Sequence, residues 1–128
     1  VNDISEREWQ KERGGTWDKG KSGDTFGPTG PYLVTSDELQ SVQNLSMSLD
    51  IDGKRMQTGN TSKMIFNINF ILSYLSNFMS LQSGDIITTG TPPGVGDGMN
   101  PKQFLKIGNK LNLKIEHLGE QNSAVIAE

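Results

Sequence analysis

Two glycine- and proline-rich stretches constrain this chain more than any other feature of its sequence. Residues 14–31 and 90–98 carry too many glycines and prolines to continue a helix or a strand, because proline lacks a backbone N–H donor and glycine is costly to order. The first stretch also contains Trp17 and Phe26, whereas flexible linkers are typically rich in glycine and serine without aromatics. The sequence therefore predicts ordered loops here, with the regular elements placed around them.

The remaining segments show patterns typical of helices and strands. A charged segment predicts a helix over 5–12 with Asp3 or Ser5 as its cap, and apolar residues at helical spacing predict a core-facing helix over 68–79 capped by Asn67. Alternating apolar residues before the turn pair Asp52-Gly53 predict a β-hairpin over 44–57. We also expect a helical turn over 35–39 and strands over 85–90, 110–118 and 122–128.

Residues 15–22, GTWDKGKS, match the nucleotide-binding pattern G-x-x-x-x-G-K-[ST]. Such a loop needs a buried strand before it and a helix N-terminus after it, whose N–H groups hold the phosphates. Here a charged helix is expected upstream, and the glycines and prolines after Ser22 exclude a helix downstream. The context argues against an ATP site and leaves the role of Lys21 open.

Composition narrows the classes of protein that remain. A chain of 128 residues is the length of one domain, and without cysteine it has neither disulfides nor thiolate chemistry. A net charge of −3 without a basic run makes nucleic acid an unsuitable partner. The apolar segment 64–79 is too short to cross a bilayer and no signal peptide opens the chain, so we expect a cytoplasmic protein. Because the chain begins Val-Asn-Asp, we also expect it to be a piece of a longer polypeptide.

If the first helix includes residues 3–10, its spacing places three polar side chains on one face. Asp3, Arg7 and Gln10 stand at i, i+4 and i+7, so an acid, a planar cation and an amide would project together. Such a set suits a metal ion and an oxygen-rich substrate, with the guanidinium matched to a carboxylate. The alternative is a solvated polar face with an Asp3–Arg7 ion pair.

Several separate motifs together resemble the catalytic domain of the fumarylacetoacetate hydrolase family. They are NDISEREWQKERGGTWDKGKSGDTFGPTGPYLVTSDE, then MIF, then LQSGDIITTGTPPGVG. The similarity runs in order from Asn2 to about Val125 and is greatest to a bacterial branch of acylpyruvate or 2,4-diketo-3-deoxy-sugar-acid hydrolases and ureidoglycolate lyases. The resemblance implies an α+β, predominantly β fold, a mixed β-sheet roll, in which residues 1–128 form the C-terminal part of one catalytic domain.

The resemblance also assigns roles to individual residues. It makes Asp3 a ligand to Mg²⁺ or Mn²⁺, with Ca²⁺ also possible, which are hard ions that suit carboxylate and keto oxygens. It gives a catalytic role to Lys21 and Gln10, so that the lysine faces an enolate or carboxylate rather than an ATP phosphate. The substrate-binding residues it implies are Arg7, Gln10, Lys21, Thr25, Gly90 and Thr91.

The chemistry implied is hydrolysis of a carbon–carbon bond in a 2,4-dioxo acid, through a metal-bound enolate. Related reactions remain open, namely ureidoglycolate lyase, 2-oxo-hept-3-ene-dioate hydratase or isomerase, and oxaloacetate decarboxylase. The resemblance further implies a homodimer that acts on a small dioxo acid. From the charge and the short apolar segment, we expect neither nucleic acid nor a membrane as a partner.

The sequence departs from the family pattern by omission. The family completes its metal site with an E-x-E motif and takes its general base from a His-Glu pair, both upstream of the segment present here. Glu6 and Glu8 do form a literal E-x-E, but two positions apart on a helix they diverge by about 200° and cannot chelate one ion. His117 matches no catalytic position of the family, so we expect a surface or turn role for it. A second hypothesis is therefore a non-catalytic module for binding or dimerisation.

Overall fold

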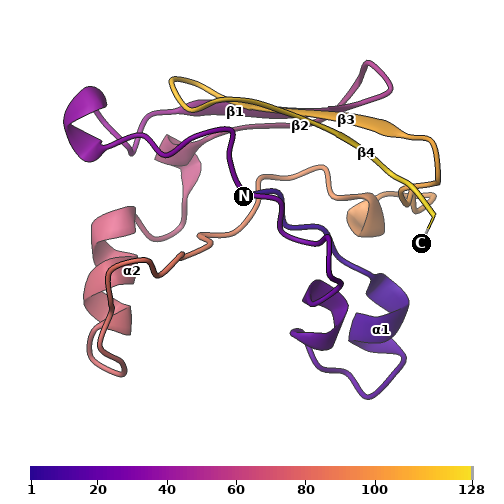
Figure 1. The fold of residues 1–128 in the computed structure, drawn as a ribbon, viewed down its shortest axis with the longest axis horizontal. Helices are drawn as coiled ribbons and strands as arrows, with labels where there is room; N and C mark the ends of the chain where they lie inside the picture. Colours follow the sequence, from indigo (N-terminus) through magenta and orange to yellow (C-terminus); the bar gives the residue numbers. More distant parts are fainter. Residues whose placement is uncertain (128) are drawn as a thin grey trace.

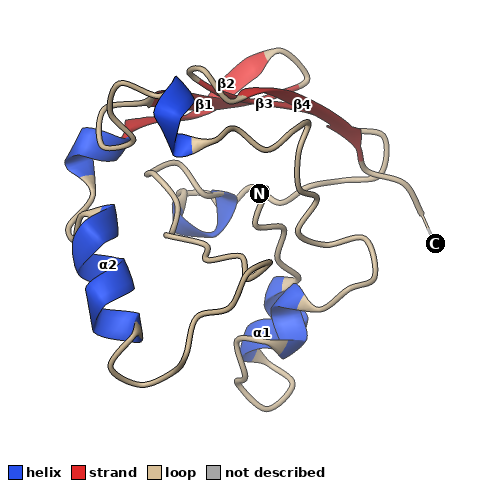
Figure 2. Cartoon of the chain, turned by 60° about the vertical axis from the view of Figure 1, so that its left-hand side comes forward, coloured by secondary structure: helices blue, strands red, loops and turns tan. Residues whose placement is uncertain are grey.

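The computed structural model describes residues 1–127, and these form one four-stranded sheet with both α-helices on the same side of it (Figure 1). The helices are α1 (Arg7–Lys11) and α2 (Ile68–Leu75), and the strands are β1 (Ser46–Ile51), β2 (Lys54–Asn60), β3 (Lys110–Ile115) and β4 (Gly119–Ala124). Short 3-10 turns are η1 (Lys19–Lys21), η2 (Ser36–Glu38), η3 (Thr61–Lys63) and η4 (Gly96–Gly98). Figure 2 shows the long loops gathered with the helices beneath the sheet.

The sheet has the strand order β2-β1-β3-β4, and each neighbouring pair is antiparallel. The β1–β2 hairpin turns at Asp52-Gly53, whose φ angles of 50° and 78° are the positive values that a type I′ turn needs, so this prediction is confirmed. The Asp52 carboxylate also accepts hydrogen bonds from the Lys110 backbone N–H at 2.8 Å and from Asn109 Nδ2 at 2.7 Å. The hairpin turn is thereby fixed to the start of β3.

One row of side chains crosses all four strands on one face of the sheet. Leu49 of β1 lies opposite both Gln57 of β2 and Leu113 of β3, and Leu113 lies opposite Gln121 of β4. Directly opposed residues of antiparallel strands point to the same side. The row Gln57–Leu49–Leu113–Gln121 therefore has leucines at its centre and one glutamine on each edge strand, and both glutamines reach the loops beneath the sheet.

The predicted fold class, α+β and predominantly β, is confirmed, although two strand predictions need correction. Residues 85–90 form a loop between Gly84 (φ 98°) and Gly90 (φ 96°), because no strand of the described sheet lies beside them to complete a ladder. β4 begins earlier than predicted, since His117 (φ 62°) and Gly119 (φ 86°) close the preceding turn within a few residues. The described strands pair only antiparallel, and residue 128 of the predicted last strand lies outside the described residues.

Both helices are shorter than predicted, and the residue that caps each N-terminus can be identified. Glu6, rather than Asp3 or Ser5, is the N-cap of α1, and its carboxylate accepts from the Glu8 backbone N–H at 2.9 Å. Asn67 caps α2 as predicted, since its side-chain oxygen accepts from the Phe70 backbone N–H at 2.8 Å. This helix nevertheless ends at Leu75 rather than at 79.

Few apolar side chains are withdrawn from water in the described structure. The accessible surface is 9437 Å², whereas a folded monomer of 14.0 kDa typically exposes about 6700 Å². Among the described residues the fully buried hydrophobic ones are Leu45 and Leu111, at 5% and 4% exposure. No helix within residues 1–127 has the length and apolar character that a membrane crossing requires.

The predicted core-facing stripe of the second helix is wrong toward its C-terminal end. Half-buried positions are Ile68, Ile71 and Leu75, whereas Leu72, Phe78 and Met79 are exposed. The helix instead presents an exposed aromatic ladder, in which consecutive ring centroids lie 4.8, 6.2 and 5.0 Å apart and whose members are Phe66, Phe70, Tyr74 and Phe78. Aromatic pairs at i, i+4 favour the helix even when no other element covers them.

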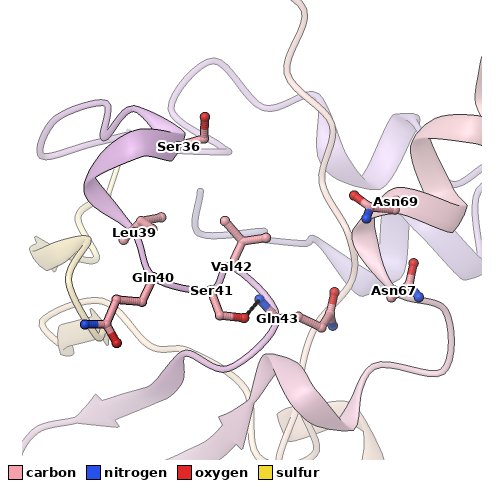
Figure 3. Close-up of a pocket in the computed structure, with 8 residues that line it drawn as sticks. All are labelled: Ser36, Leu39, Gln40, Ser41, Val42, Gln43, Asn67 and Asn69. Carbon is pink, nitrogen blue, oxygen red and sulfur yellow. Dashed lines mark hydrogen bonds between the residues drawn. The ribbon is translucent and has the colours of Figure 1, made fainter.

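A glutamine side chain joins the start of α2 to the loop before the sheet. Gln43 donates from Nε2 to the Thr61 carbonyl at 2.6 Å and accepts at Oε1 from the Ile68 backbone N–H at 3.0 Å. Gln43 also lines a polar hollow of about 490 Å³ between residues 36–43 and the start of α2 (Figure 3). Both ends of the amide thus bind main-chain groups: the Ile68 N–H, for which Gln43 is the acceptor, and the Thr61 carbonyl, which also accepts from the Met64 N–H at 3.2 Å.

We expect Gln43→Leu to lower the free energy of unfolding by about 1–3 kcal/mol, because it leaves the half-buried Ile68 N–H without its acceptor and removes one donor to the Thr61 carbonyl. Gln40→Leu is the matched control, since Gln40 is exposed and its side chain makes no hydrogen bond within residues 1–127; it should change stability by less than about 0.5 kcal/mol. Urea denaturation followed by circular dichroism measures both. Equal losses for the two variants would contradict the cross-link.

Candidate active site

Arg7 and Gln10 lie on one face of α1, as their spacing predicted, and they contact each other. Arg7 donates from Nη1 to Gln10 Oε1 at 2.6 Å. Gln10 is only 4% exposed, yet its Nε2 has no hydrogen-bond partner within the described chain. Buried donors of this kind are rarely left unpaired, since each costs about 1–3 kcal/mol. Arg7 therefore fixes the amide through its oxygen, and the buried N–H₂ group is left without a partner in the described chain.

Asp3 precedes α1 and does not share this helix face, so the predicted three-residue arrangement on one helix is wrong. Its Oδ2 instead accepts from Lys21 Nζ at 2.6 Å, and Lys21 also donates to Ser5 Oγ at 2.6 Å. The ammonium lies 6.0 Å from the ring centroid of Trp17, within cation–π range. The alternative ion pair, Asp3 with Arg7, is replaced by Asp3 with Lys21.

Gly20 explains why the nucleotide-binding pattern occurs without its usual function. A Cβ at this position would lie 2.5 Å from Gln10 Cβ and 2.7 Å from the Glu6 carbonyl oxygen, while the Gly20 carbonyl accepts from the Glu6 backbone N–H at 2.9 Å. The glycine therefore lets η1 pack directly on α1. Since a helix precedes this loop and irregular chain follows Ser22, the predicted absence of a P-loop framework agrees with the structure.

Two of the other predicted substrate-binding residues, Thr25 and Gly90, are exposed. Thr25 is exposed in the turn that the Phe26 N–H closes onto the Gly23 carbonyl, and its side chain makes no hydrogen bond in residues 1–127. Gly90 is exposed with a positive φ of 96°, where a side chain would be strained. Neither has a hydrogen bond in the described chain to Lys21 or Gln10.

Thr91 follows Gly90 and is fixed to the edge of the sheet. Its Oγ1 accepts from Gln57 Nε2 at 2.9 Å, and the same Nε2 donates to the Pro92 carbonyl at 2.7 Å. The edge strand β2 thus determines where this hydroxyl lies. On the opposite edge, Gln121 donates to the Pro28 and Gly30 carbonyls at 2.9 and 3.0 Å.

A long-range ion pair joins α1 to the loop that carries Gly90 and Thr91. Lys11 at the end of α1 pairs with Asp97 in η4, and Lys102 donates to the same carboxylate at 2.9 Å. These hydrogen bonds, first from Lys11 and then from Lys102, lower the pKa of Asp97 to about 2. In Figure 1 the orange turn η4 lies between the sheet and α1. The two halves of the candidate site are therefore tied together by charge.

Sequence reasoning missed Gln57, Gln121 and Asp97, which position the site without belonging to a motif assigned to it. Their partners lie far along the chain, with separations of 34 residues for Gln57–Thr91 and 86 for Lys11–Asp97. Neither helical nor strand periodicity links residues at such distances. The predicted hairpin included Gln57 in its second strand, but nothing in the sequence indicated which loop its side chain would contact.

The acidic residues near Asp3 have other partners. Glu6 caps α1 with an extended backbone, so it does not lie on the helix as expected, and Glu8 in the first turn pairs with Arg13. His117 lies exposed in the turn between β3 and β4, beside Glu116. Within residues 1–127, no three carboxylate, histidine or cysteine side chains converge as a metal site would require. Asp3 can supply one ligand, and the described residues alone do not complete a metal centre.

These features define an enzyme-like site on a small α+β fold: a buried amide with a free donor beside an arginine, a lysine–aspartate pair, and an anchored hydroxyl loop. Residues 1–126 match the family described as fumarylacetoacetate (FAA) hydrolase C-terminal, and the chain belongs to this family. Members of the family are enzymes, and they generally use a divalent metal.

Individual relatives agree with that assignment. A protein of Burkholderia lata, whose name gives it as a hydrolase without a substrate, is 60% identical over 122 residues, which are 94% of this chain and 43% of that protein. The fumarylacetoacetate hydrolase of Exiguobacterium antarcticum superposes with a TM-score of 0.94 at 36% identity, covering 98% of this chain and 45% of its own. The 2-hydroxyhepta-2,4-diene-1,7-dioate isomerase of Mycobacterium marinum gives 0.83 at 32%, covering 97% and 45%. The chain thus spans less than half the length of these relatives.

We expect Gly20→Ala to destabilise the protein by about 1–3 kcal/mol, because the new methyl group must displace Gln10 or the Glu6 carbonyl. Gly98→Ala is the matched control, since its Cβ would meet only Val95 Cγ2 at an ordinary 3.7 Å. Thermal unfolding of both variants measures the difference. A Gly20→Ala protein as stable as Gly98→Ala would show that α1 and η1 are not in contact.

We expect Asp97→Asn to lower stability at neutral pH, and the loss to disappear in acid. Because the folded-state pKa of Asp97 is about 2, below its ordinary 3.8, the ion pairs stabilise the fold above about pH 4 and are lost as pH falls through about 2. Urea denaturation between pH 2 and 6 should show the parent and the variant converging as pH falls. Asp18→Asn, an exposed aspartate at the start of η1 without a side-chain cap hydrogen bond, controls for the lost charge. A difference that stays constant over this range would contradict the role of Asp97.

Proposed function

We propose that the protein catalyses divalent-metal-dependent hydrolysis of a carbon–carbon bond in a 2,4-dioxo acid of the acylpyruvate type. The observation that carries this proposal is the buried Gln10 amide, whose Nε2 is oriented by Arg7 and left without a partner. A free donor next to a guanidinium suits an anion with several adjacent oxygens, as the 2-oxo acid end of an acylpyruvate provides. The maleylpyruvate hydrolase of Sphingobium, another structural relative, names an acylpyruvate as its substrate and supports this substrate class.

The residues of this chain would bind the substrate and stabilise the charge that develops during cleavage. Arg7 and the loop at Gly90-Thr91, with Thr25 as a further hydroxyl, would hold the carboxylate. Gln10 Nε2 and the Lys21 ammonium would offset negative charge on the enolate oxygen, which typically contributes 10²–10³ in rate for each donor. Lys21 is already held in place, by Asp3 and Ser5, so little reorganisation is needed.

The proposed reaction adds water to the carbonyl remote from the carboxylate. The C–C bond next to that carbonyl then breaks, the bond electrons remain on the three-carbon fragment as pyruvate enolate, and a proton converts the enolate to pyruvate. The other product is the carboxylic acid formed from the acyl group. We assign the general base to another part of the full-length polypeptide, because His117 lies exposed in the turn between β3 and β4.

Asp3 would supply one carboxylate ligand to Mg²⁺ or Mn²⁺, with Ca²⁺ a third candidate. The other ligands would come from another part of the full-length polypeptide. When bound, such an ion would supply Lewis-acid polarisation of the oxo oxygens. We also retain the proposal that the whole protein is a homodimer, for which the exposed aromatic ladder offers apolar surface.

A second candidate is another enolate reaction on the same site. The isomerase among the structural relatives favours a hydratase or isomerase acting on a 2-oxo-heptene-dioate, and lyase or decarboxylase chemistry would use the same residues. The lone carboxylate at Asp3 favours the remaining possibility, a module that binds without catalysis until other ligands are supplied.

The test is a substrate panel with the full-length polypeptide encoded by the gene, with and without Mn²⁺. The panel contains acetylpyruvate, ureidoglycolate, a 2-oxo-hept-3-ene-dioate and oxaloacetate. We expect Mn²⁺-dependent release of pyruvate from acetylpyruvate, and a fall in kcat of about 10²–10³ in Lys21→Met, because the charge on the enolate is then unbalanced. Lys19→Met, which removes a neighbouring exposed ammonium, is the control. Turnover of another panel member alone would replace the hydrolase proposal, and no turnover would favour the binding module.

A further inference from the structure

Gln57 occupies an unusual place relative to the candidate site, because it touches no predicted catalytic residue and yet holds one substrate-binding hydroxyl. Both of its polar contacts are in the loop at 91–92: Nε2 donates to Thr91 Oγ1 at 2.9 Å and to the Pro92 carbonyl at 2.7 Å. The residue lies on the edge strand β2 and is half-buried. Its partners therefore depend on a rigid element of the sheet.

The loop lies so close to β2 that it has little freedom to shift. A Cβ on Gly94, where φ is 107°, would lie 2.1 Å from the Met56 carbonyl oxygen, and a Cβ on Gly59 would lie 2.6 Å from Pro92 Cβ. Glycine is needed on both sides of this contact, once in the loop and once in the strand. Gln57 stands between these two close approaches, so the position of its amide is set by the backbone around it.

The chemistry of the two partners fixes which way the amide points. A carbonyl oxygen such as that of Pro92 can only accept, so the group facing it must be the N–H₂ end of Gln57. The same nitrogen faces Thr91 Oγ1, which must therefore accept as well. A hydroxyl carries a single hydrogen, and here that hydrogen is not used to bind Gln57. The Thr91 O–H is left to donate, and Thr91 is exposed.

We infer that Gln57 is a positioning residue that sets the polarity of the Thr91 hydroxyl, making it a hydrogen-bond donor toward the substrate carboxylate. The inference rests on the proposed function, in which the Gly90-Thr91 loop holds that carboxylate. Gln121, on the other edge of the sheet, shows the contrast: it also donates to two oxygens of a loop, but both are carbonyls, so it anchors without orienting any hydroxyl.

Reversing the hydrogen bond tests this role. In Gln57→Glu the carboxylate can only accept, so the Thr91 O–H should turn toward residue 57 and leave the substrate. We expect the KM of the full-length polypeptide for acetylpyruvate to rise about tenfold with kcat nearly unchanged, because binding but not the chemical step loses a hydrogen bond. For the methyl ester of acetylpyruvate, which has no carboxylate, the KM should change by less than about twofold. Gln40→Glu places the same charge at an exposed position and is the matched control.

A double-variant comparison separates hydroxyl polarity from simple charge repulsion. In a Thr91→Val background no hydroxyl remains, so adding Gln57→Glu should raise KM no further. Gln57→Met removes the donor without adding charge and should raise KM two- to threefold. Circular dichroism monitors folding, and Gln57→Met replaces Gln57→Glu as the test variant if the latter unfolds. An effect of Gln57→Glu that persists with Thr91→Val, or that is equal for acid and ester, would overturn the role of Gln57 and leave the proposed function standing. A parent protein inactive on both compounds would overturn the proposed function and this inference with it.

Discussion

The Gln57–Leu49–Leu113–Gln121 row is the constraint on which the rest of the structure depends. Its two leucines pack in the middle of the sheet, while the glutamine on each edge strand reaches down to a loop. Those loops have no ladder of their own, so their backbone oxygens need donors from elsewhere. One row of a four-stranded sheet thereby determines where residues 28–30 and residues 91–92 lie. The sheet therefore sets the positions of two loops that have no regular backbone hydrogen bonding of their own.

In this chain hydrogen bonds from side-chain amides fix the positions of the loops, a role that apolar packing has in a typical domain. With only Leu45 and Leu111 fully buried among the described hydrophobic residues, contact area alone does not specify the positions of the loops. Hydrogen bonds contribute about 1 kcal/mol each, but they require particular distances and angles. Gln43, Gln57 and Gln121 each satisfy two main-chain or hydroxyl groups at once. Such contacts give precise placement with modest stability, which suits a site more than a core.

Local patterns predicted the elements that local physics controls. The Asp52-Gly53 turn and the Asn67 cap were correct because each depends on the conformation of one or two residues. The segment 85–90 was wrong because an apolar run becomes a strand only if a neighbour pairs with it, and none of the described strands does. Asp3 was misplaced in a helix because Glu6 competes for the same capping role. The contacts of Gln57 and Asp97 depend on distant partners, which no periodicity within one sequence can reveal.

The loop GTWDKGKS shows how one pattern serves two different physical purposes. In a P-loop, glycine allows the backbone to approach a phosphate, and lysine reaches over the same ligand. In this chain Gly20 allows the backbone to approach Gln10 and the Glu6 carbonyl, and Lys21 reaches over to Asp3 and Ser5. Both uses require a residue without Cβ at a close approach, followed by a long cation. The match of letters therefore carries no shared ligand: Gly15, the first glycine of the pattern, has open space around it, and the neighbouring elements, a helix here and a buried strand there, decide what Gly20 approaches.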